Sequence, residues 1–334
     1  MLTQEQLNQI RENLEASQNP LFFFDNDVDG LMSFLILRRA IGRGKGVAIK
    51  SFPDLKEQYV RKVEELNPDA IFILDKAELS KEFADAIEQK GIPMTWIDHH
   101  ETKTPKEIIE KTSYFNSHPS SEPTTYIAQK IFNRQQDLWL AVIGCIGDVY
   151  MPDFAEKFSE EYPELLPKGI EPFDALHSSE IGKMVRMLNF GLMDTITNVV
   201  TLIKYLFKAN SPADLLEENQ YTKQLHKRYS QLNEFYTKQV AKAESKFYPE
   251  SPVLFYTYSG NTSMSAEISN KLYHKHKDKL IIVAFIRPEK VNVSIRGEKA
   301  LETTKKLIAN VEATGAMIPI DDFETFKENI KQIL

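Results

Sequence analysis

The stretch Leu21-Phe-Phe-Phe-Asp25-Asn-Asp27-Val-Asp29-Gly30 places three carboxylates at alternating positions directly after an apolar run. A calcium loop of the EF-hand type begins with a similar D-x-D-x-D-G pattern. Such a loop needs a bidentate Glu at its twelfth position, where this chain has Ile36, and a helix in front of it. The sequence instead predicts a buried strand that presents acids at the edge of a sheet, where open α/β folds bind ligands.

Further apolar runs follow without the polar alternation of half-exposed strands, and segments with helical periodicity, such as 32–41 and 79–87, lie between them. Strands buried on both faces that alternate with helices indicate a parallel sheet of the α/β class. The predicted strands cover residues 21–24, 47–52, 70–74 and 94–97.

The strand pattern disappears from about residue 181 to 248, where the spacing predicts helices, and returns after Pro249 and Pro252. We therefore expect a parallel-sheet domain joined by a helical connector to a smaller α/β C-terminal domain. The expected boundaries are 1–190, 191–249 and 250–334.

Composition narrows the class of protein. The chain has 42% hydrophobic and 27% charged residues, and its longest uncharged apolar run, 138–146, is short for a membrane span. The one cysteine, Cys145, lies inside that run, so we expect a buried thiol, no disulfide and a cytoplasmic location.

The net charge of −7 argues against a protein that binds polyanions such as nucleic acids non-specifically over its whole surface. Between residues 251 and 310, however, ten Lys or Arg stand against five Asp or Glu, which favours local contact with nucleic acid. A lysine-rich surface that only contacts solvent is the alternative.

Acidic residues also follow other apolar runs: Asp75 after 71–74, Asp98-His99-His100 after 94–97, and Asp148, a fourth candidate strand end, after 138–146 and Gly147. Carboxylates gathered in one crevice repel each other by about 4 kcal/mol per pair at 4 Å and an effective dielectric constant of about 20. Divalent cations would remove this repulsion. Carboxylates with one or two imidazoles suit Mn²⁺ or Mg²⁺ better than a structural zinc, which prefers thiolates. A single strand-end Asp more often caps a helix, and an isolated His pair more often lies in a surface turn, but the four motifs together predict a metal site. Two such ions bridged by one carboxylate can serve phosphoester hydrolysis.

These motifs, in order and roughly in spacing, resemble the four motifs of the DHH phosphoesterases, and most of all RecJ-like proteins of archaeal type. The segments Val293-Ser-Ile-Arg296-Gly297 and Glu312-Ala-Thr-Gly315-Ala316 resemble parts of the DHH-associated substrate domain. The resemblance extends over nearly the whole chain.

The resemblance implies roles for individual residues. The implied metal ligands are Asp25, Asp27, Asp75, His99 and Asp148, with Asp75 as the bridge between two Mn²⁺ ions, or Mg²⁺ in their place. Asp98 would orient His99, His100 would face the scissile phosphate, and Asp29 would stand behind the ligands. Arg296 would bind a substrate phosphate, together with Gly315 and the position of Asn310.

The chain departs from the family at Ile308-Ala-Asn310, where a glycine run ending in His is usual. Ala and Asn approach and bind a phosphate less well than Gly and His, so the departure concerns how substrate is held. All four metal motifs are present.

The leading interpretation is a manganese-dependent phosphodiesterase that acts as an exonuclease on single-stranded nucleic acid or short oligonucleotides. A phosphatase or phosphodiesterase of small nucleotides, such as bisphosphorylated or cyclic dinucleotides, is one alternative. A non-catalytic scaffold with protein partners in replication or repair is another, and intact ligands argue against it. No membrane partner is expected.

Overall fold

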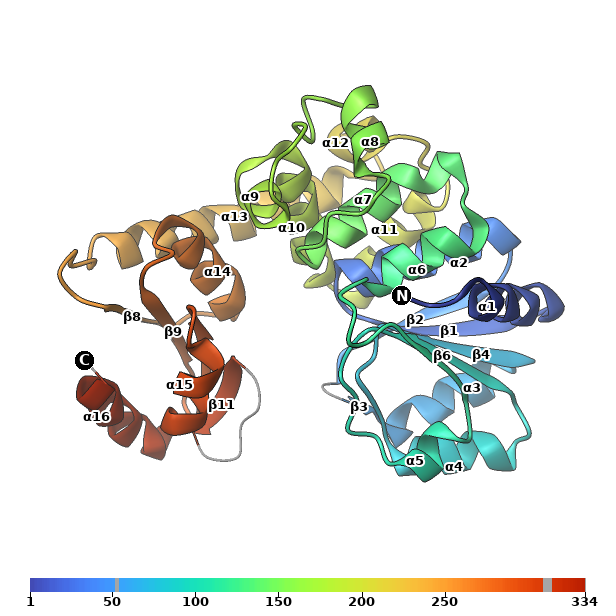
Figure 1. The fold of residues 1–334 in the computed structure, drawn as a ribbon, viewed down its shortest axis with the longest axis horizontal. Coiled ribbons are helices and arrows are strands. Elements are labelled where there is room, and N and C mark those ends of the chain that lie inside the picture. Colours follow the sequence, from blue (N-terminus) through green and yellow to red (C-terminus); the bar gives the residue numbers. More distant parts are fainter. Residues whose placement is uncertain (52–53, 309–313, 334) are drawn as a thin grey trace. The chain divides into compact units, whose positions relative to one another are not determined.

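The computed structural model describes residues 1–51, 54–308 and 314–333. The chain divides into two compact units, Met1–Tyr229 and Ser230–Leu334. Helix α13 (Lys223–Glu244) begins in the first unit and ends in the second, as Figure 1 shows. Each unit has its own sheet and its own buried core.

The first unit is built on a five-stranded sheet in which every neighbouring pair is parallel, in the order β2-β1-β4-β6-β7. This confirms the predicted parallel α/β fold. A separate pair of two-residue strands, β3 (Asp54–Leu55) and β5 (Glu78–Leu79), lies outside the sheet. The strands of the sheet are β1 (Pro20–Asp25), β2 (Lys45–Ile49), β4 (Ala70–Leu74), β6 (Met94–Asp98) and β7 (Ser113–Asn116).

The side chains of β1 explain why its sequence shows no polar alternation. Successive side chains of a strand point to opposite faces of the sheet. Phe22 and Phe24 pack into one buried cluster, whereas Leu21 and Phe23 pack into another. Both faces are therefore covered, as Figure 1 shows for the helices on the two sides of the sheet. The first face is covered by α1 (Gln4–Ala16), α2 (Val28–Ile41), α6 (Thr124–Phe132) and α7 (Leu138–Gly147), and the second by α3 (Val60–Leu66), α4 (Lys81–Gln89) and α5 (Lys106–Ile109).

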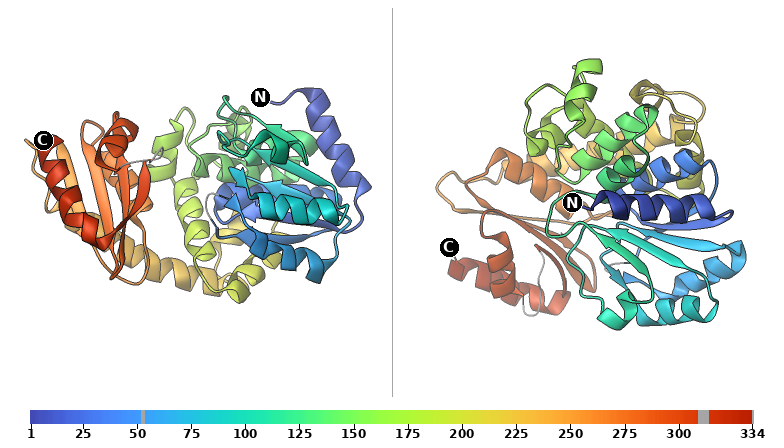
Figure 2. Two further views of the ribbon diagram at one scale, coloured as in Figure 1. Left: turned by 90° about the horizontal axis from the view of Figure 1, so that it is seen from below. Right: turned by 45° about the vertical axis from the view of Figure 1, so that its right-hand side comes forward.

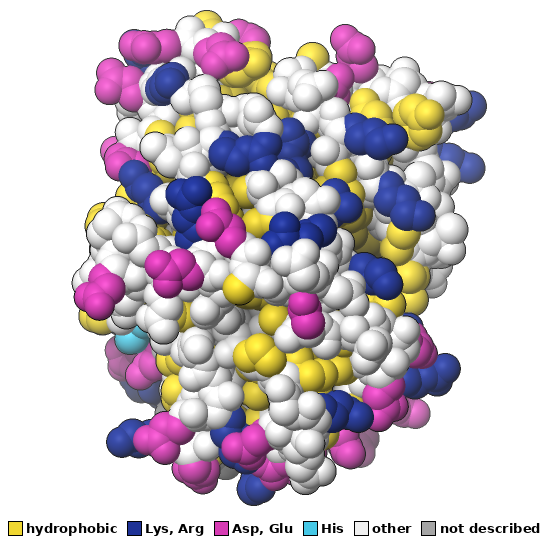
Figure 3. All heavy atoms as spheres, turned by 90° about the vertical axis from the view of Figure 1, so that its right-hand side faces the viewer, with side chains coloured by type: hydrophobic (Ala, Val, Ile, Leu, Met, Phe, Trp, Pro, Cys, Tyr) yellow, Lys and Arg dark blue, Asp and Glu magenta, His cyan; other side chains and the backbone are white. Residues whose placement is uncertain are grey.

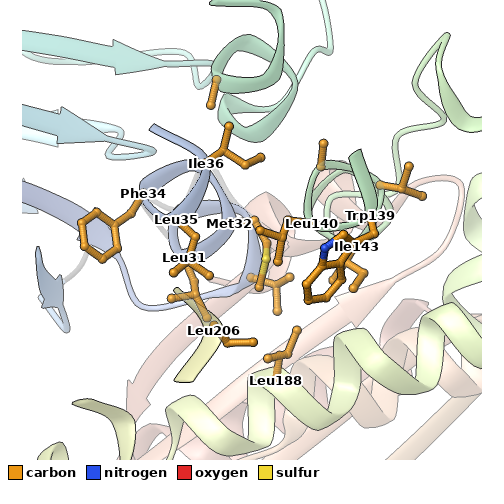
Figure 4. Close-up of a cluster of buried hydrophobic side chains, with 14 of the residues drawn as sticks. Leu31, Met32, Phe34, Leu35, Ile36, Trp139, Leu140, Ile143, Leu188 and Leu206 are labelled. Atoms are coloured by element: carbon orange, nitrogen blue, oxygen red, sulfur yellow. The ribbon is translucent and has the colours of Figure 1, made fainter. Parts of the chain in front are cut away.

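The larger of the two buried clusters on the faces of this sheet, the one that contains Phe22 and Phe24, continues into a layer of helices. In Figure 4, Met32 of α2 lies beside Leu140 of α7, and Leu31 of α2 lies close to Leu206. The apolar run 138–146 is thus a buried helix rather than a strand, which corrects one expectation from the sequence. The other helices of this unit are α8 (Ala155–Glu161), α9 (Pro172–Ser178), α10 (Glu180–Leu192), α11 (Ile196–Leu206) and α12 (Pro212–Leu216), with short 3₁₀ turns at Glu57–Tyr59 and Gln135–Asp137.

Gly30 allows the chain to turn from β1 into α2. A Cβ atom at this position would lie 2.4 Å from the backbone oxygen of Asp25, so any larger residue would push the strand end and the helix apart. The glycine therefore keeps the three acids of the first motif in one tight turn.

The second unit contains a four-stranded sheet of order β11-β10-β9-β8, in which only β8 and β9 run parallel. Helix α16 packs against one face of this sheet through Phe323, Phe326 and Ile330, and α15 joins the same cluster through Ala300 and Leu307. Helix α14 packs against β9 and β10 (Figure 2). The elements are β8 (Val253–Tyr258), α14 (Ser265–Lys275), β9 (Leu280–Ile286), β10 (Lys290–Arg296), α15 (Ala300–Leu307), β11 (Gly315–Pro319), a 3₁₀ turn at Ile320–Asp322 and α16 (Phe323–Ile333).

The surface carries its charge unevenly. Figure 3 shows a band of Lys and Arg side chains across the upper half of one face, with few Asp or Glu side chains among them. Among the described residues, no helix is long and apolar enough to cross a membrane.

Candidate metal centre

Three acids meet at one edge of the first sheet because β1, β4 and β6 are parallel neighbours. Asp25 ends β1, Asp75 follows the last residue of β4, and Asp98 ends β6. The strands are in register, with Phe24 opposite Leu74 and Leu74 opposite Ile97. The strand ends that the sequence predicts to carry acids therefore lie side by side.

His99 is the residue on which these groups converge. Its Nε2 lies 3.3 Å from Oδ1 of Asp75, 3.2 Å from Oδ2 of Asp148 and 3.9 Å from Oδ2 of Asp29. The atom is buried and makes no hydrogen bond of acceptable geometry within the described part of the chain. A ring nitrogen surrounded by carboxylate oxygens in this way suits a cation shared among them.

Asp148 reaches the cluster from a helix. It directly follows α7, so the fourth acid stands at a helix end and not at the strand end that the sequence suggested. The next residue, Val149, has a φ angle of 57°, and Asp75 has the same value. The left-handed conformation is costly for non-glycine residues, above all for a β-branched one, and such strain concentrates at functional sites. Of the two strained residues, Asp75 is itself an acid of the cluster and Val149 directly follows another, Asp148.

Asp98 pairs with the second histidine of its motif. Oδ1 of Asp98 lies 2.9 Å from Nδ1 of His100, and Oδ2 accepts the backbone N–H of His100. The expectation that Asp98 orients His99 is therefore wrong in this structure. Asp98 is fully buried, whereas the side chain of His100 is 44% exposed, so the pair holds a partly accessible imidazole beside the cluster.

Asp27 and Asp29 serve the local fold as well as the cluster. Oδ1 of Asp27 accepts the N–H of Gly30 and caps α2. The two oxygens of Asp29 accept the N–H groups of Thr124 and Thr125, 2.8 Å and 2.7 Å away, at the first turn of α6. Asp29 therefore fastens α6 to α2, and its Oδ2 also lies 3.9 Å from Nε2 of His99.

Burial and mutual repulsion make the cluster electrostatically costly. Burial, followed by repulsion from Asp148 and Asp25, raises the pKa of Asp27 to about 7. Burial and Asp148 raise the pKa of Asp29 to about 6, and burial holds the pKa of Asp75 well above its usual range. Burial on its own lowers the pKa of His99, but the carboxylates of Asp148 and Asp75 raise it to about 12. A bound cation would relieve this repulsion.

The donor atoms fit a divalent ion. Asp75, His99 and His100 each offer one atom within 4.8 Å of the others, and Asp29, His99 and Asp148 do the same. Carboxylate oxygens with one or two imidazole nitrogens form the donor set expected for Mn²⁺ or Mg²⁺. Asp25 and Asp27 belong to neither group. Asp27 is nevertheless close enough to Asp148 and Asp25 for their charges to raise its pKa.

Residues 21–151 match the sequence model of the DHH family, N-terminal domain. This segment is a DHH-family domain. It contains β1 to β7 and ends just beyond Asp148, so it includes all the acids and both histidines of the candidate centre. The resemblance inferred from the motifs is confirmed.

The fold beyond the DHH domain is also that of known structures. A manganese-bound exonuclease RecJ matches with a TM-score of 0.64 at 14% identity, covering 99% of this chain and 95% of that one. A DHH domain from a member of the s1p family of ribosomal proteins matches with a TM-score of 0.66 at 13% identity, covering 99% and 90%. The pGpG-specific phosphodiesterase PggH from Vibrio cholerae matches with a TM-score of 0.51 at 11% identity, covering 94% and 97%. No curated protein matches the sequence.

The residues expected to bind substrate lie outside the DHH domain. Arg296 ends β10 and donates hydrogen bonds to Oδ1 of Asn270 and to the carbonyl and hydroxyl oxygens of Thr314. Gly315 begins β11 and is exposed. Asn310 lies outside the described residues.

Sequence reasoning missed one charged residue at the DHH centre. Lys76 follows Asp75 directly and is buried, and its Nζ lies 3.3 Å from Oδ1 of Asp25. The only signal in the sequence is a lysine beside a strand-end acid, in a segment whose neighbours are apolar.

Proposed function

We propose that the protein is a metal-dependent phosphodiesterase that hydrolyses single-stranded nucleic acid or short oligonucleotides, as an exonuclease of RecJ type. The convergence of His99 with Asp75 and Asp148 carries this proposal. The DHH-family match supports a phosphoesterase. A pair of divalent ions would activate water and neutralise charge on the phosphoryl oxygens.

The proposed ligands share the carboxyl edge of the sheet and its neighbouring helices. We assign the central place to Asp75, because it lies beside His99 and close to His100. The hydrogen bond to Asp98 fixes the ring of His100, so that this imidazole can meet a phosphate oxygen. The ligands are Asp25, Asp27, Asp75, His99 and Asp148, with Asp29 supporting them.

Manganese is the proposed ion, with magnesium as the alternative. The donor set favours hard, octahedral cations over structural zinc. One solved RecJ structure of this fold is described as bound to manganese, and RecJ from Thermus thermophilus has been solved with Mg²⁺.

We propose a division of labour along the chain. Residues 1–190 would carry the chemistry, 191–249 would connect, and 250–334 would hold the substrate. Arg296 would bind a phosphate, with Gly315 and the position of Asn310 close by in sequence. The excess of basic residues between 251 and 310 supports contact with a polyanion.

A second candidate is a phosphodiesterase of small nucleotides. The structural similarity to a pGpG-specific phosphodiesterase favours it, as does the departure from the glycine-and-histidine pattern around Asn310. Both candidates use the same metal centre and differ in the length of the substrate.

One experiment separates them. Purified protein with Mn²⁺ is incubated with end-labelled oligonucleotides of 2, about 10 and about 30 nucleotides, and in parallel with cyclic and bisphosphorylated nucleotides. Shortening of the long strands to mononucleotides supports the exonuclease. Turnover confined to dinucleotides supports the second candidate. Absence of hydrolysis with every substrate, in protein that binds Mn²⁺, contradicts both.

A further inference from the structure

Lys76 is a buried lysine inside the centre of the DHH domain. Its side chain is only 1% exposed, and buried lysines are rare unless an acid or another strong acceptor pairs with them. The ammonium lies 3.3 Å from Oδ1 of Asp25 and donates a hydrogen bond to the carbonyl oxygen of Ser51, 2.6 Å away. One proposed metal ligand is therefore already paired with a cation that belongs to the protein.

The backbone of Lys76 is held in place. The residue before it, Asp75, adopts a left-handed conformation with φ of 57°. The indole N–H of Trp96, a fully buried side chain, donates to the carbonyl oxygen of Lys76 at 2.8 Å. Asp75 can thereby lie beside His99 while its neighbour reaches Asp25. The ammonium is a fixed part of the site, unlike a mobile surface charge.

Lys76 and the N–H of Asn26 both bind the same oxygen of Asp25, Oδ1. An ion shared with Asp25 would use the same carboxylate group and would therefore stand within a few ångströms of the ammonium. Like charges so close, in a buried setting, oppose each other strongly. The proposed ligands Asp75 and Asp148 instead gather around the imidazole of His99, 3.3 Å and 3.2 Å from its Nε2.

We propose that Lys76 is a positioning residue that acts as an internal cation for Asp25. It orients and neutralises this carboxylate before metal binds, and it lowers the affinity of the centre for the ion that shares Asp25. The centre then binds one ion tightly, around His99, and a second ion weakly, on the Asp25 side. This inference rests on the proposed metal-dependent function and states how the two ions differ.

Lys76→Met tests the inference, because methionine keeps much of the length and apolar stem of lysine and removes the charge. Mn²⁺ binding is measured by calorimetry on metal-free protein and by the electron paramagnetic resonance signal of free Mn²⁺. We expect two classes of site in the wild type, and a second class that binds at least about tenfold more tightly in Lys76→Met. Metal-free Lys76→Met should melt at a lower temperature, since Asp25 loses its partner.

The controls separate charge from packing. Lys76→Arg keeps the charge and should retain two classes that differ as in the wild type. Lys111→Met removes a lysine that pairs with Asp85 and Glu88 away from the centre, and should leave Mn²⁺ binding unchanged. Asp25→Asn should weaken or abolish the second class and keep the first, and it provides the test if Lys76→Met does not fold.

Any one of three results would overturn the role of Lys76 and leave the proposed metal-dependent function standing. The first is equal affinity for both ions in the wild type, and the second is Mn²⁺ binding by Lys76→Met that is no tighter than in the wild type. The third is loss of the tight class of site in Asp25→Asn. A merely structural lysine would weaken both classes when replaced. If the wild type binds no Mn²⁺ at all, the proposed metal-dependent function fails, and the role of Lys76 fails with it.

Discussion

Nδ1 of His100 lies 2.9 Å from Oδ1 of Asp98. Because a carboxylate oxygen accepts hydrogen bonds, this contact favours a hydrogen on Nδ1 of His100 and leaves Nε2 for another partner. Burial on its own lowers the pKa of His100, but Asp98 raises it, so the pair favours the charged imidazolium. A phosphate oxygen that gains negative charge is a suitable partner for that ring.

Asp98→Asn is expected to lower turnover by about two to four orders of magnitude, because an amide can donate to Nδ1 and reverse the tautomer. Mn²⁺ affinity should change little, since His100 and not His99 contacts Asp98. Steady-state kinetics and calorimetry on the same preparation check both points. Asp153→Asn, at an exposed acid paired with Lys130, is the matched control. A fall in Mn²⁺ affinity as large as the fall in turnover would make His100 a ligand instead.

Asp75→Asn is expected to reduce hydrolysis by several orders of magnitude, because this carboxylate lies between His99 and His100 and is the proposed bridge. Treatment with EDTA should have the same effect on the wild type, and added Mn²⁺ should restore only the wild type. The two-metal proposal is wrong if metal-stripped protein, or the variant, hydrolyses oligonucleotides as fast as the Mn²⁺-loaded parent.

Metal-free protein is expected to lose stability as pH rises. The pKa of Asp27 is about 7 in the folded protein and 3.8 for an ordinary aspartate, so folding is favoured while this group is protonated. Its contribution is complete below pH 3.8 and is lost as the pH passes about 7, at about 1.4 kcal/mol per pH unit in between.

Thermal melts of dialysed wild type and Asp27→Asn, compared between these two pH values, check this prediction. The difference between the two proteins should shift in favour of the variant as the pH rises. Saturating Mn²⁺ should reverse the trend in the wild type, because ligands must be deprotonated to bind. Identical pH profiles for both metal-free proteins would show that Asp27 does not titrate in this range.

Arg296→Ala is expected to impair hydrolysis of oligonucleotides through KM and kcat together and to leave a small chromogenic phosphodiester nearly unaffected. Arg287→Ala, in which the lost guanidinium lies over Phe285 on the same sheet, is the control. Asn310→His restores the family residue and should improve oligonucleotide turnover severalfold at most. Equal losses on both substrates in Arg296→Ala would instead assign this residue to the fold of its unit.

The sheet was predictable because its strands are buried on both faces, which leaves long apolar runs such as Phe22 to Phe24. The same criterion failed at 138–146, since a buried helix is as apolar as a buried strand and periodicity cannot distinguish them. Strand β7 was missed because its four residues include Ser113 and Asn116, which resemble a loop.

The acids at the ends of β1, β4 and β6 were predictable from their places after strands, and Asp148 from its place after an apolar run, whereas the partners of these acids were not. The link between Lys76 and Asp25 joins residues 51 positions apart, and the link between Asp29 and Thr124 joins residues 95 apart. Local sequence carries no trace of such contacts. Only the register of the parallel strands and the packing of α6 on α2 bring these groups together.

The reactivity of Cys145 reports the opening of α7. The chain has one thiol, fully buried in α7 and three residues before Asp148, and burial holds its pKa well above the usual range. A thiol reagent can reach it only when α7 opens, so the rate of labelling measures how often that helix leaves the core. Because an ion bound at Asp148 favours the closed state, Mn²⁺ should slow the labelling in proportion to its occupancy. Metal binding at the centre can thus be followed without a substrate, an engineered label or an assay of catalysis.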